Sequence, residues 1–259
     1  MPAPRFERYF GVDYSGAQTA DQSLPGLRIY EGTPGSEPVE VLPPPSPRKY
    51  FTRREVAEWL VAQLRDGPPT LVGIDHGFSF PLRYFEVHRI EPDWDTFLDD
   101  FKKHWPTDLP SVYVQFIRDG LVGEGALRMG SPRWRRATEE RCRGKSVFHF
   151  DVQGSVAKST HAGLPWLRYI RQRVDAHFWP FDGWSPAAGR SVIAEVYPSL
   201  WKKLYPVENR TPDQQDAYSI VRWFQEHDAL GDLAWYFNPD LTGTSPLVAA
   251  LEGWILGVL

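Results

Sequence analysis

The sequence has one cysteine, Cys142, among 259 residues. A single thiol excludes an internal disulfide framework and a cysteine-based zinc site. Residues 1–6 lack the apolar stretch of a secretory signal peptide. We therefore expect a protein of the reducing cytoplasm.

Long apolar runs are also missing. No segment approaches the ~20 apolar residues that a membrane-spanning helix needs. The apolar stretch 247–259 is short and is interrupted by Glu252. It predicts a packed C-terminal helix, and no membrane partner is expected.

The chain has no excess of positive charge. Its formal net charge of −4 argues against a generally basic coat for nucleic acid, but it leaves room for a local basic groove. The segment from Arg128 to Lys145 is basic, although it also contains Glu139 and Glu140. We refer to it as the basic segment. Its basic residues are Arg128, Arg133, Arg135, Arg136, Arg141, Arg143 and Lys145.

Material for a core is plentiful, since 42% of residues are hydrophobic and eleven are tryptophan. The length fits one large domain, or one domain with an insertion. Periodicity is weak at about 84–150, yet no linker-like composition bounds that region. We predict a single domain, residues 1–259, with a largely helical insertion at about 84–150.

The order of predicted elements indicates an α/β fold. Apolar segments at 8–13, 26–30 and 39–42 predict three antiparallel strands, and the proline run 43–47 predicts a loop. A helix follows, opened by a capping box of Thr52 and Glu55. Further strands at 70–75 and 191–196, with weaker signals at 147–152, complete a mixed sheet with flanking helices.

Four carboxylates stand where a core does not favour them. Asp13, Asp75 and Glu195 each end or interrupt an apolar strand, and Asp216 lies near the start of a helix. Burying an unpaired carboxylate costs several kcal/mol. Two such charges 4 Å apart also repel by about 4 kcal/mol at an effective dielectric of 20. A divalent metal ion would hold such a group together.

The helix of Asp216 begins with Thr211 as N-cap and proline at its first position. Ala217, Ile220, Val221 and Phe224 form its apolar stripe. Asp213 and Asp216 extend that stripe by one turn. A carboxylate on a core-facing stripe favours a functional interpretation of Asp216.

Structural explanations remain open for each acid. Asp213 also suits the positive end of the helix dipole. A carboxylate after a strand often caps the next helix or accepts loop amides. In open α/β sheets, however, ligands bind beyond the carboxyl ends of the parallel strands, where these acids would gather.

Five short motifs resemble a known family. They are Gly11-Val12-Asp13-Tyr14-Ser15-Gly16-Ala17, Gly73-Ile74-Asp75-His76-Gly77-Phe78-Ser79-Phe80-Pro81, Glu195-Val196-Tyr197-Pro198-Ser199, Asp213-Gln214-Gln215-Asp216-Ala217 and Glu252-Gly253-Trp254-Ile255-Leu256-Gly257. In order and spacing they resemble domain of unknown function 429, a family of predicted nucleases in the ribonuclease-H-like superfamily.

The resemblance implies a ribonuclease-H-like mixed five-stranded sheet, with the first three strands antiparallel and the next two parallel to the first. It implies catalytic acids at Asp13, Asp75 and Asp216. Asp213 corresponds to an extra acidic or histidine position of resolvase-like members. Glu195 belongs to the narrower family motif alone.

Such a site suits Mg²⁺ or Mn²⁺, since carboxylate oxygens are hard ligands. Two ions about 4 Å apart would activate a water and stabilise the departing oxygen of a phosphodiester. We expect Asp13 to bridge the ions, with Asp75 and Asp216 each completing one shell. Asp213 or Glu195 would orient a ligand or a water.

A nucleic-acid partner also needs cations for its phosphates. Arg135, Arg136 and Lys145 of the basic segment are candidates, with Trp134 as a stacking face. Lys158, in a polar loop before a helix, is another. The alternative for the basic segment is a solvated helix surface without a ligand. The alternative for Lys158 is a loop with a purely structural role.

Two other functions compete with a nuclease. An ATP-using enzyme of the actin or sugar-kinase fold also delivers an aspartate, here Asp13, into a turn of small residues. No second Asp-Gly-Thr/Gly phosphate turn and no Gly-rich adenosine loop accompany it. A catalytically silent binding protein on the same fold is the third possibility.

Overall fold

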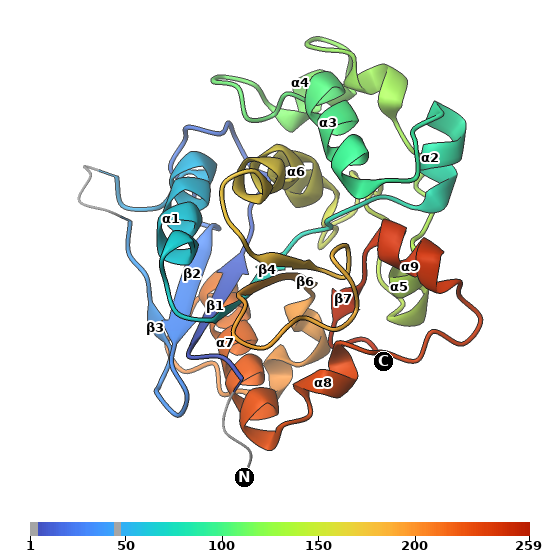
Figure 1. Cartoon of the computed structure of the whole chain (residues 1–259). Coiled ribbons are helices and arrows are strands. Elements are labelled where there is room, and N and C mark those ends of the chain that lie inside the picture. Colours follow the sequence, from blue (N-terminus) through green and yellow to red (C-terminus); the bar gives the residue numbers. More distant parts are fainter. Residues whose placement is uncertain (1–4, 44–47) are drawn as a thin grey trace.

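The computed structural model describes residues 5–43 and 48–259. Its mixed sheet has the order β3-β2-β1-β4-β6-β5, with β7 pairing β6 (Figure 1). The pairs β1–β2 and β2–β3 are antiparallel, and β1–β4, β4–β6, β5–β6 and β6–β7 are parallel. The strands are β1 (Arg8–Asp13), β2 (Arg28–Gly32), β3 (Val39–Glu40), β4 (Thr70–Asp75), β5 (His177–Trp179), β6 (Val192–Val196) and β7 (Ile255–Leu256). The predicted ribonuclease-H-like arrangement is confirmed.

The outer edge differs from the sequence prediction, which had five strands. β5 and β7 follow one another along β6: β5 pairs its first residues, and β7 pairs Glu195 and Val196. Strands of two and three residues are too short for a periodic signal. Residues 147–152, predicted as a strand, form turns. Residues 44–47 of the proline run lie outside the described residues.

The C-terminal segment is not one helix. α9 (Pro246–Glu252) ends where Gly253 adopts φ +76°, and the chain then enters β7. A left-handed residue favours glycine and cannot continue a helix. In the described part of the chain, no helix combines the length and apolarity needed to cross a membrane.

Helices cover both faces of the sheet (Figure 1). α1 (Arg53–Arg65), which begins with the predicted capping box of Thr52 and Glu55, and α6 (Ala157–Arg171) pack on one face. α7 (Pro212–Leu230) and α8 (Leu233–Tyr236) pack on the other. Side chains alternate accordingly: Phe10 and Val12 face α1, whereas Tyr9 faces α7.

The segment between β4 and α6 is largely helical, as predicted. Its elements are α2 (Leu82–His88), α3 (Trp94–His104), α4 (Val114–Arg118), the 3₁₀ turn η1 (Gly125–Arg128) and α5 (Ala137–Arg141). α3 packs on α6, and its Phe97 and Phe101 belong to the same buried cluster as Phe10. The insertion therefore extends the core of the sheet.

Two glycines let α7 lie close to the sheet. A Cβ on Gly11 would sit 2.2 Å from the carbonyl oxygen of Ala217, and one on Gly73 would sit 2.7 Å from Ile220 and Phe224. Any larger residue would push the helix away. Because Ala217 follows Asp216, this close packing brings the start of α7 to the carboxyl ends of β1 and β4.

Candidate metal centre

Asp13 and Asp75 end neighbouring strands at the same level. They are register partners in the parallel pair β1–β4, as are Gly11 and Gly73 two residues earlier. Side chains two residues apart share a face, so both aspartates lie on the side of the sheet that carries α7. Asp216, from the second turn of α7, completes the group: one oxygen of each of the three carboxylates lies within 4.8 Å of the others.

The three carboxylates are poorly solvated. Asp13 is 9% exposed, and Oδ1 of Asp75 is buried without a hydrogen-bond partner among the described residues. Burial, followed by repulsion from Asp216 and Glu195, raises the pKa of Asp75 to about 8. Burial and the neighbouring aspartates also raise the pKa of Asp13 well above its usual range. The arrangement therefore lacks positive charge at its centre.

Lys202 supplies part of that charge and was missed in the sequence. It begins the 3₁₀ turn η3 (Lys202–Leu204), and its Nζ lies 2.8 Å from Oδ1 and 2.9 Å from Oδ2 of Asp216. The Gln215 side chain donates to the Lys202 carbonyl (3.3 Å) and so ties this turn to α7. The only sequence signal was the place of Lys202 shortly after the Glu195-Val196-Tyr197-Pro198-Ser199 motif.

Asp213 lies beside the three-carboxylate group and not within it. It stands one turn before Asp216 in α7, and its carboxylate faces Gly26: a Cβ built there would be 3.5 Å from Oδ2. Its charge raises the pKa of both Asp13 and Asp216, although burial contributes more in each case. Asp213 thus adds to the negative potential at the three carboxylates from a position beside them.

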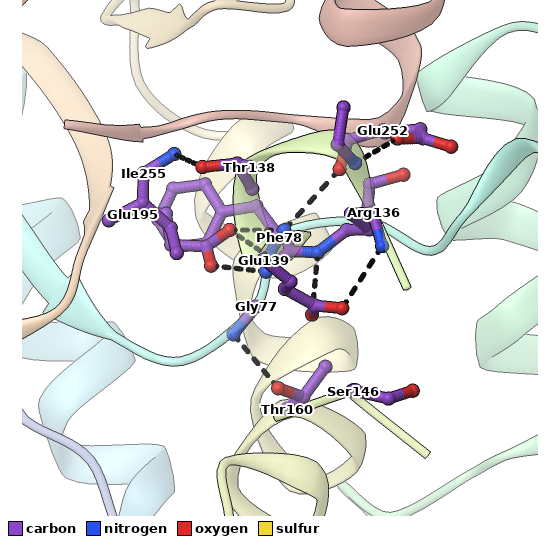
Figure 2. Close-up of polar contacts among 12 residues, drawn as sticks. Gly77, Phe78, Arg136, Thr138, Glu139, Ser146, Thr160, Glu195, Glu252 and Ile255 are labelled. Carbon is purple, nitrogen blue, oxygen red and sulfur yellow. Dashed lines mark hydrogen bonds and ion pairs between the residues drawn. The ribbon is translucent and has the colours of Figure 1, made fainter. Parts of the chain in front are cut away.

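Glu195 does not join the group, which corrects the sequence-based expectation. Its register partner is Ile74, one residue before Asp75, so its side chain lies on the opposite face of the sheet. There its two oxygens accept hydrogen bonds from Arg136 (2.6 Å each), and Oε2 also accepts one from the Phe78 N–H (3.0 Å; Figure 2). Glu195 thereby fixes the loop that follows Asp75.

Arg136, expected to contact phosphate, is 1% exposed and therefore closed to a substrate. Besides Glu195, its guanidinium donates to Glu139 (2.9 Å) and to the Glu252 carbonyl. Glu252 in turn accepts from the backbone N–H groups of Leu82 and Ala137 (both 2.7 Å). Figure 2 shows this buried network joining α5 to the segment after β4.

Three of the six other cations of the basic segment also have partners within the protein. Arg128 pairs with Asp100 (2.9 Å), Arg141 donates to the Asp240 carbonyl, and Lys145 donates to the Gln153 carbonyl. Arg135 is exposed and has no side-chain partner among the described residues. Arg133 and Arg143 are exposed in the same way, so the segment divides between an internal network and three exposed arginines.

Lys158 has a different setting. It lines an open groove of about 620 Å³ that begins at Asp13 and Asp213. Its ammonium group has no hydrogen bond or ion pair with any residue that the structure describes. Of the four expected phosphate contacts, Lys158 is the one that lines this groove with Asp13 and Asp213.

His76, directly after Asp75, is a packing residue. It is 2% exposed, its Nδ1 lies 2.9 Å from the Gly77 carbonyl, and its ring packs against Tyr14 and Phe78. Burial lowers its pKa to about 4. The neutral ring stabilises the turn after β4.

The three aspartates fit a hard divalent cation. All the donors are carboxylate oxygens, and the buried Oδ1 of Asp75 lacks any other partner. Mg²⁺ binds oxygen at 2.0–2.1 Å, so its ligand atoms lie about 3–4 Å apart. Small side-chain rotations bring oxygens spread over 4.8 Å onto one ion, and the same spread admits two ions about 4 Å apart.

Comparison with known proteins gives no relative for this chain. No family model matches it, and neither a curated protein nor a solved structure does.

Proposed function

We propose that this protein is a divalent-metal-dependent hydrolase of phosphodiester bonds in nucleic acid, and that it is a divergent member of the ribonuclease-H-like nucleases. The observation that carries the proposal is the group Asp13, Asp75 and Asp216, with its unpartnered buried oxygen. The fold supports it, since Asp13 and Asp75 stand at the carboxyl ends of parallel strands, where α/β sheets bind ligands, and Asp216 approaches them from α7.

Asp13, Asp75 and Asp216 would together hold one or two Mg²⁺ or Mn²⁺ ions in this proposal, with Asp13 as a ligand shared between them if two are bound. Asp75 and Asp216 each complete the ligand set of one ion. When bound, such ions activate a water and stabilise the departing oxyanion of a phosphodiester. Asp213 orients the ligands from the rim.

Lys202 has two tasks in this account. Without metal, it neutralises Asp216 and so limits the repulsion among the aspartates. About a third of its side chain is exposed, so it is free to turn toward a phosphate once a cation neutralises Asp216. It thus keeps a positive charge at the cluster in both states.

Calorimetric titration with Mn²⁺ tests the proposal. Wild type is expected to bind Mn²⁺, and Asp13→Asn is expected to lose most of the heat. Asp66→Asn, an exposed aspartate at the end of α1, is the matched control and is expected to behave as wild type. Cleavage of labelled single-stranded and duplex DNA and RNA in Mn²⁺ is measured alongside.

The competing functions predict other results. Negligible heats for both wild type and Asp13→Asn would support a silent binding protein. Tight ATP binding with Mg²⁺, without cleavage of nucleic acid, would support a phosphotransferase. Metal binding with cleavage that Asp13→Asn abolishes supports the hydrolase.

A further inference from the structure

The groove beside the acids has two contrasting walls. The loop after β1, from Tyr14 to Gln18, and the start of α6 form a polar wall that includes Lys158 and Ser159. Tyr113 and Phe116, at the start of α4, form an aromatic wall. Its volume of about 620 Å³ lies within the range of sites that hold a ligand of drug-like size.

The aromatic wall is not explained by packing. Phe116 is 40% exposed, whereas its neighbours Val114 and Ile117 are buried in the core. The rings of Phe116 and Tyr113 lie 4.8 Å apart and are tilted by 48°, so together they form a small apolar surface open to the groove. Such a surface suits the flat face of a nucleobase.

The polar wall is held rigidly. Gly16 lies so close to α6 that a Cβ there would be 2.2 Å from the backbone of Lys158. The Arg53 guanidinium donates to the carbonyls of Ser15 (3.2 Å), Ala17 (2.6 Å) and Gln18 (3.3 Å). Packing therefore fixes the backbone of Lys158 relative to the loop that follows Asp13.

We propose that this groove holds an unpaired nucleotide next to the bond that the metal centre cleaves, so that the substrate is single-stranded nucleic acid. The base stacks on Phe116 and Tyr113, and Lys158 contacts a phosphate. This inference rests on the proposed function, because it places the reacting phosphodiester at Asp13.

Duplex nucleic acid fits this groove poorly. Inside a duplex both faces of a base are covered by its neighbours, so an aromatic wall reaches only a base that has left the stack. Binding a duplex strongly also requires many phosphate contacts. Of the six arginines of the basic segment, Arg128, Arg136 and Arg141 are paired within the protein, so only three exposed ones remain for such contacts.

Fluorescence anisotropy in EDTA tests the groove without hydrolysis. The probes are labelled oligo-dT and oligo-U of about a dozen nucleotides and a duplex of equal length. Wild type is expected to bind either single strand at least about tenfold more tightly than the duplex. Phe116→Ala and Tyr113→Ala each lower that affinity roughly tenfold, the usual effect of one stacking contact.

Two control variants separate stacking from folding. Phe116→Trp keeps an aromatic face and retains affinity within about twofold. Leu127→Ala removes a 79% exposed apolar side chain of the same insertion outside the groove and leaves binding unchanged. Equal binding of duplex and single strand overturns the inference, as does a loss in Phe116→Ala no larger than that in Leu127→Ala.

Hydrolysis in Mn²⁺ distinguishes this inference from the proposed function. A wild-type protein that binds Mn²⁺ and cleaves duplex as fast as single strand contradicts the groove assignment and leaves the hydrolase intact. Failure to hydrolyse either substrate, with the stacking pattern present, refutes the hydrolase and supports the groove as a single-strand site.

Discussion

Asp13 and Asp75 are register partners at the carboxyl ends of two neighbouring parallel strands. Parallel pairing with this register places two like charges side by side on one face of the sheet. Asp216 then approaches from α7, which packs closely because Gly11 lacks a side chain. The fold thus assembles a repulsive group that a cation relieves.

Relief of this repulsion predicts a more stable variant. Asp75→Asn removes a buried carboxyl group, which destabilises the metal-free fold either as an unpaired charge or through the proton it must take up on folding. In EDTA its melting temperature is expected to rise by at least about 2 °C, the shift that roughly 1 kcal/mol gives at this chain length. In saturating Mn²⁺ the order reverses, because wild type alone gains stability from the ion. Differential scanning calorimetry in both buffers measures this, and a lower melting temperature in EDTA would contradict it.

The pH dependence of the metal-free protein follows from the raised pKa of Asp75. Its value of about 8 in the folded state exceeds the ordinary 3.8, so between these values the folded protein binds more protons than the unfolded chain. The contribution of Asp75 to the free energy of unfolding therefore falls as pH rises from about 4 to about 8.

Urea unfolding of wild type and Asp75→Asn at pH 5.5 and 8.0 measures this contribution together with the effect of Asp75 on the pKa of Asp13, because groups away from these two aspartates titrate alike in both proteins. Wild type is expected to lose more stability than the variant between these values. Equal losses in the two proteins would show that Asp75 does not titrate in this range.

Lys202 competes with a metal ion for Asp216. Lys202→Met removes the only cation that contacts the three aspartates in the described structure. The variant is expected to melt at a lower temperature in EDTA and to bind Mn²⁺ several-fold more tightly, since no ammonium group has to be displaced. The neighbouring Lys203→Met is the matched control. Weaker Mn²⁺ binding by Lys202→Met would show that Lys202 supports the ion instead.

Glu195 is predicted to be a structural residue. Glu195→Gln removes one of the two carboxylates that contact the buried Arg136 guanidinium and leaves Glu139 as its charge partner, so the expected loss is that of a charged hydrogen bond, about 1.5–3 kcal/mol. Chemical denaturation measures that loss. Below the melting temperature the variant is expected to bind Mn²⁺ as wild type does. Loss of Mn²⁺ binding in the folded variant would show that Glu195 contributes to the metal centre.

The sequence predicted those parts of the fold that have strong local signals. The capping boxes at Thr52 and Thr211, the apolar strands and the inward stripe of α7 led to the α/β class and to the candidate acids, whereas the strand arrangement and the grouping of three aspartates were implied by the family resemblance. β5 and β7 were not predicted, because strands of three and two residues give no periodic signal. The register of β6 cannot be read from one strand alone, and a single residue of offset turned Glu195 to the other face.

The cations were harder to assign, because a run of basic residues does not disclose its partners. Arg136 looks like its exposed neighbour Arg135 in the sequence, yet it is fully buried between Glu139 and Glu195. Lys202 gave no motif of its own. Both assignments depend on contacts between residues far apart in the chain.

The central claim is that Asp13, Asp75 and Asp216 bind a divalent cation together. Anomalous diffraction from crystals soaked in Mn²⁺ tests it most directly. We predict one or two anomalous peaks about 2.0–2.5 Å from carboxylate oxygens of all three residues, with Nζ of Lys202 moved away from Asp216. No peak among these oxygens at saturating Mn²⁺, with Lys202 still bound to Asp216, would contradict the account.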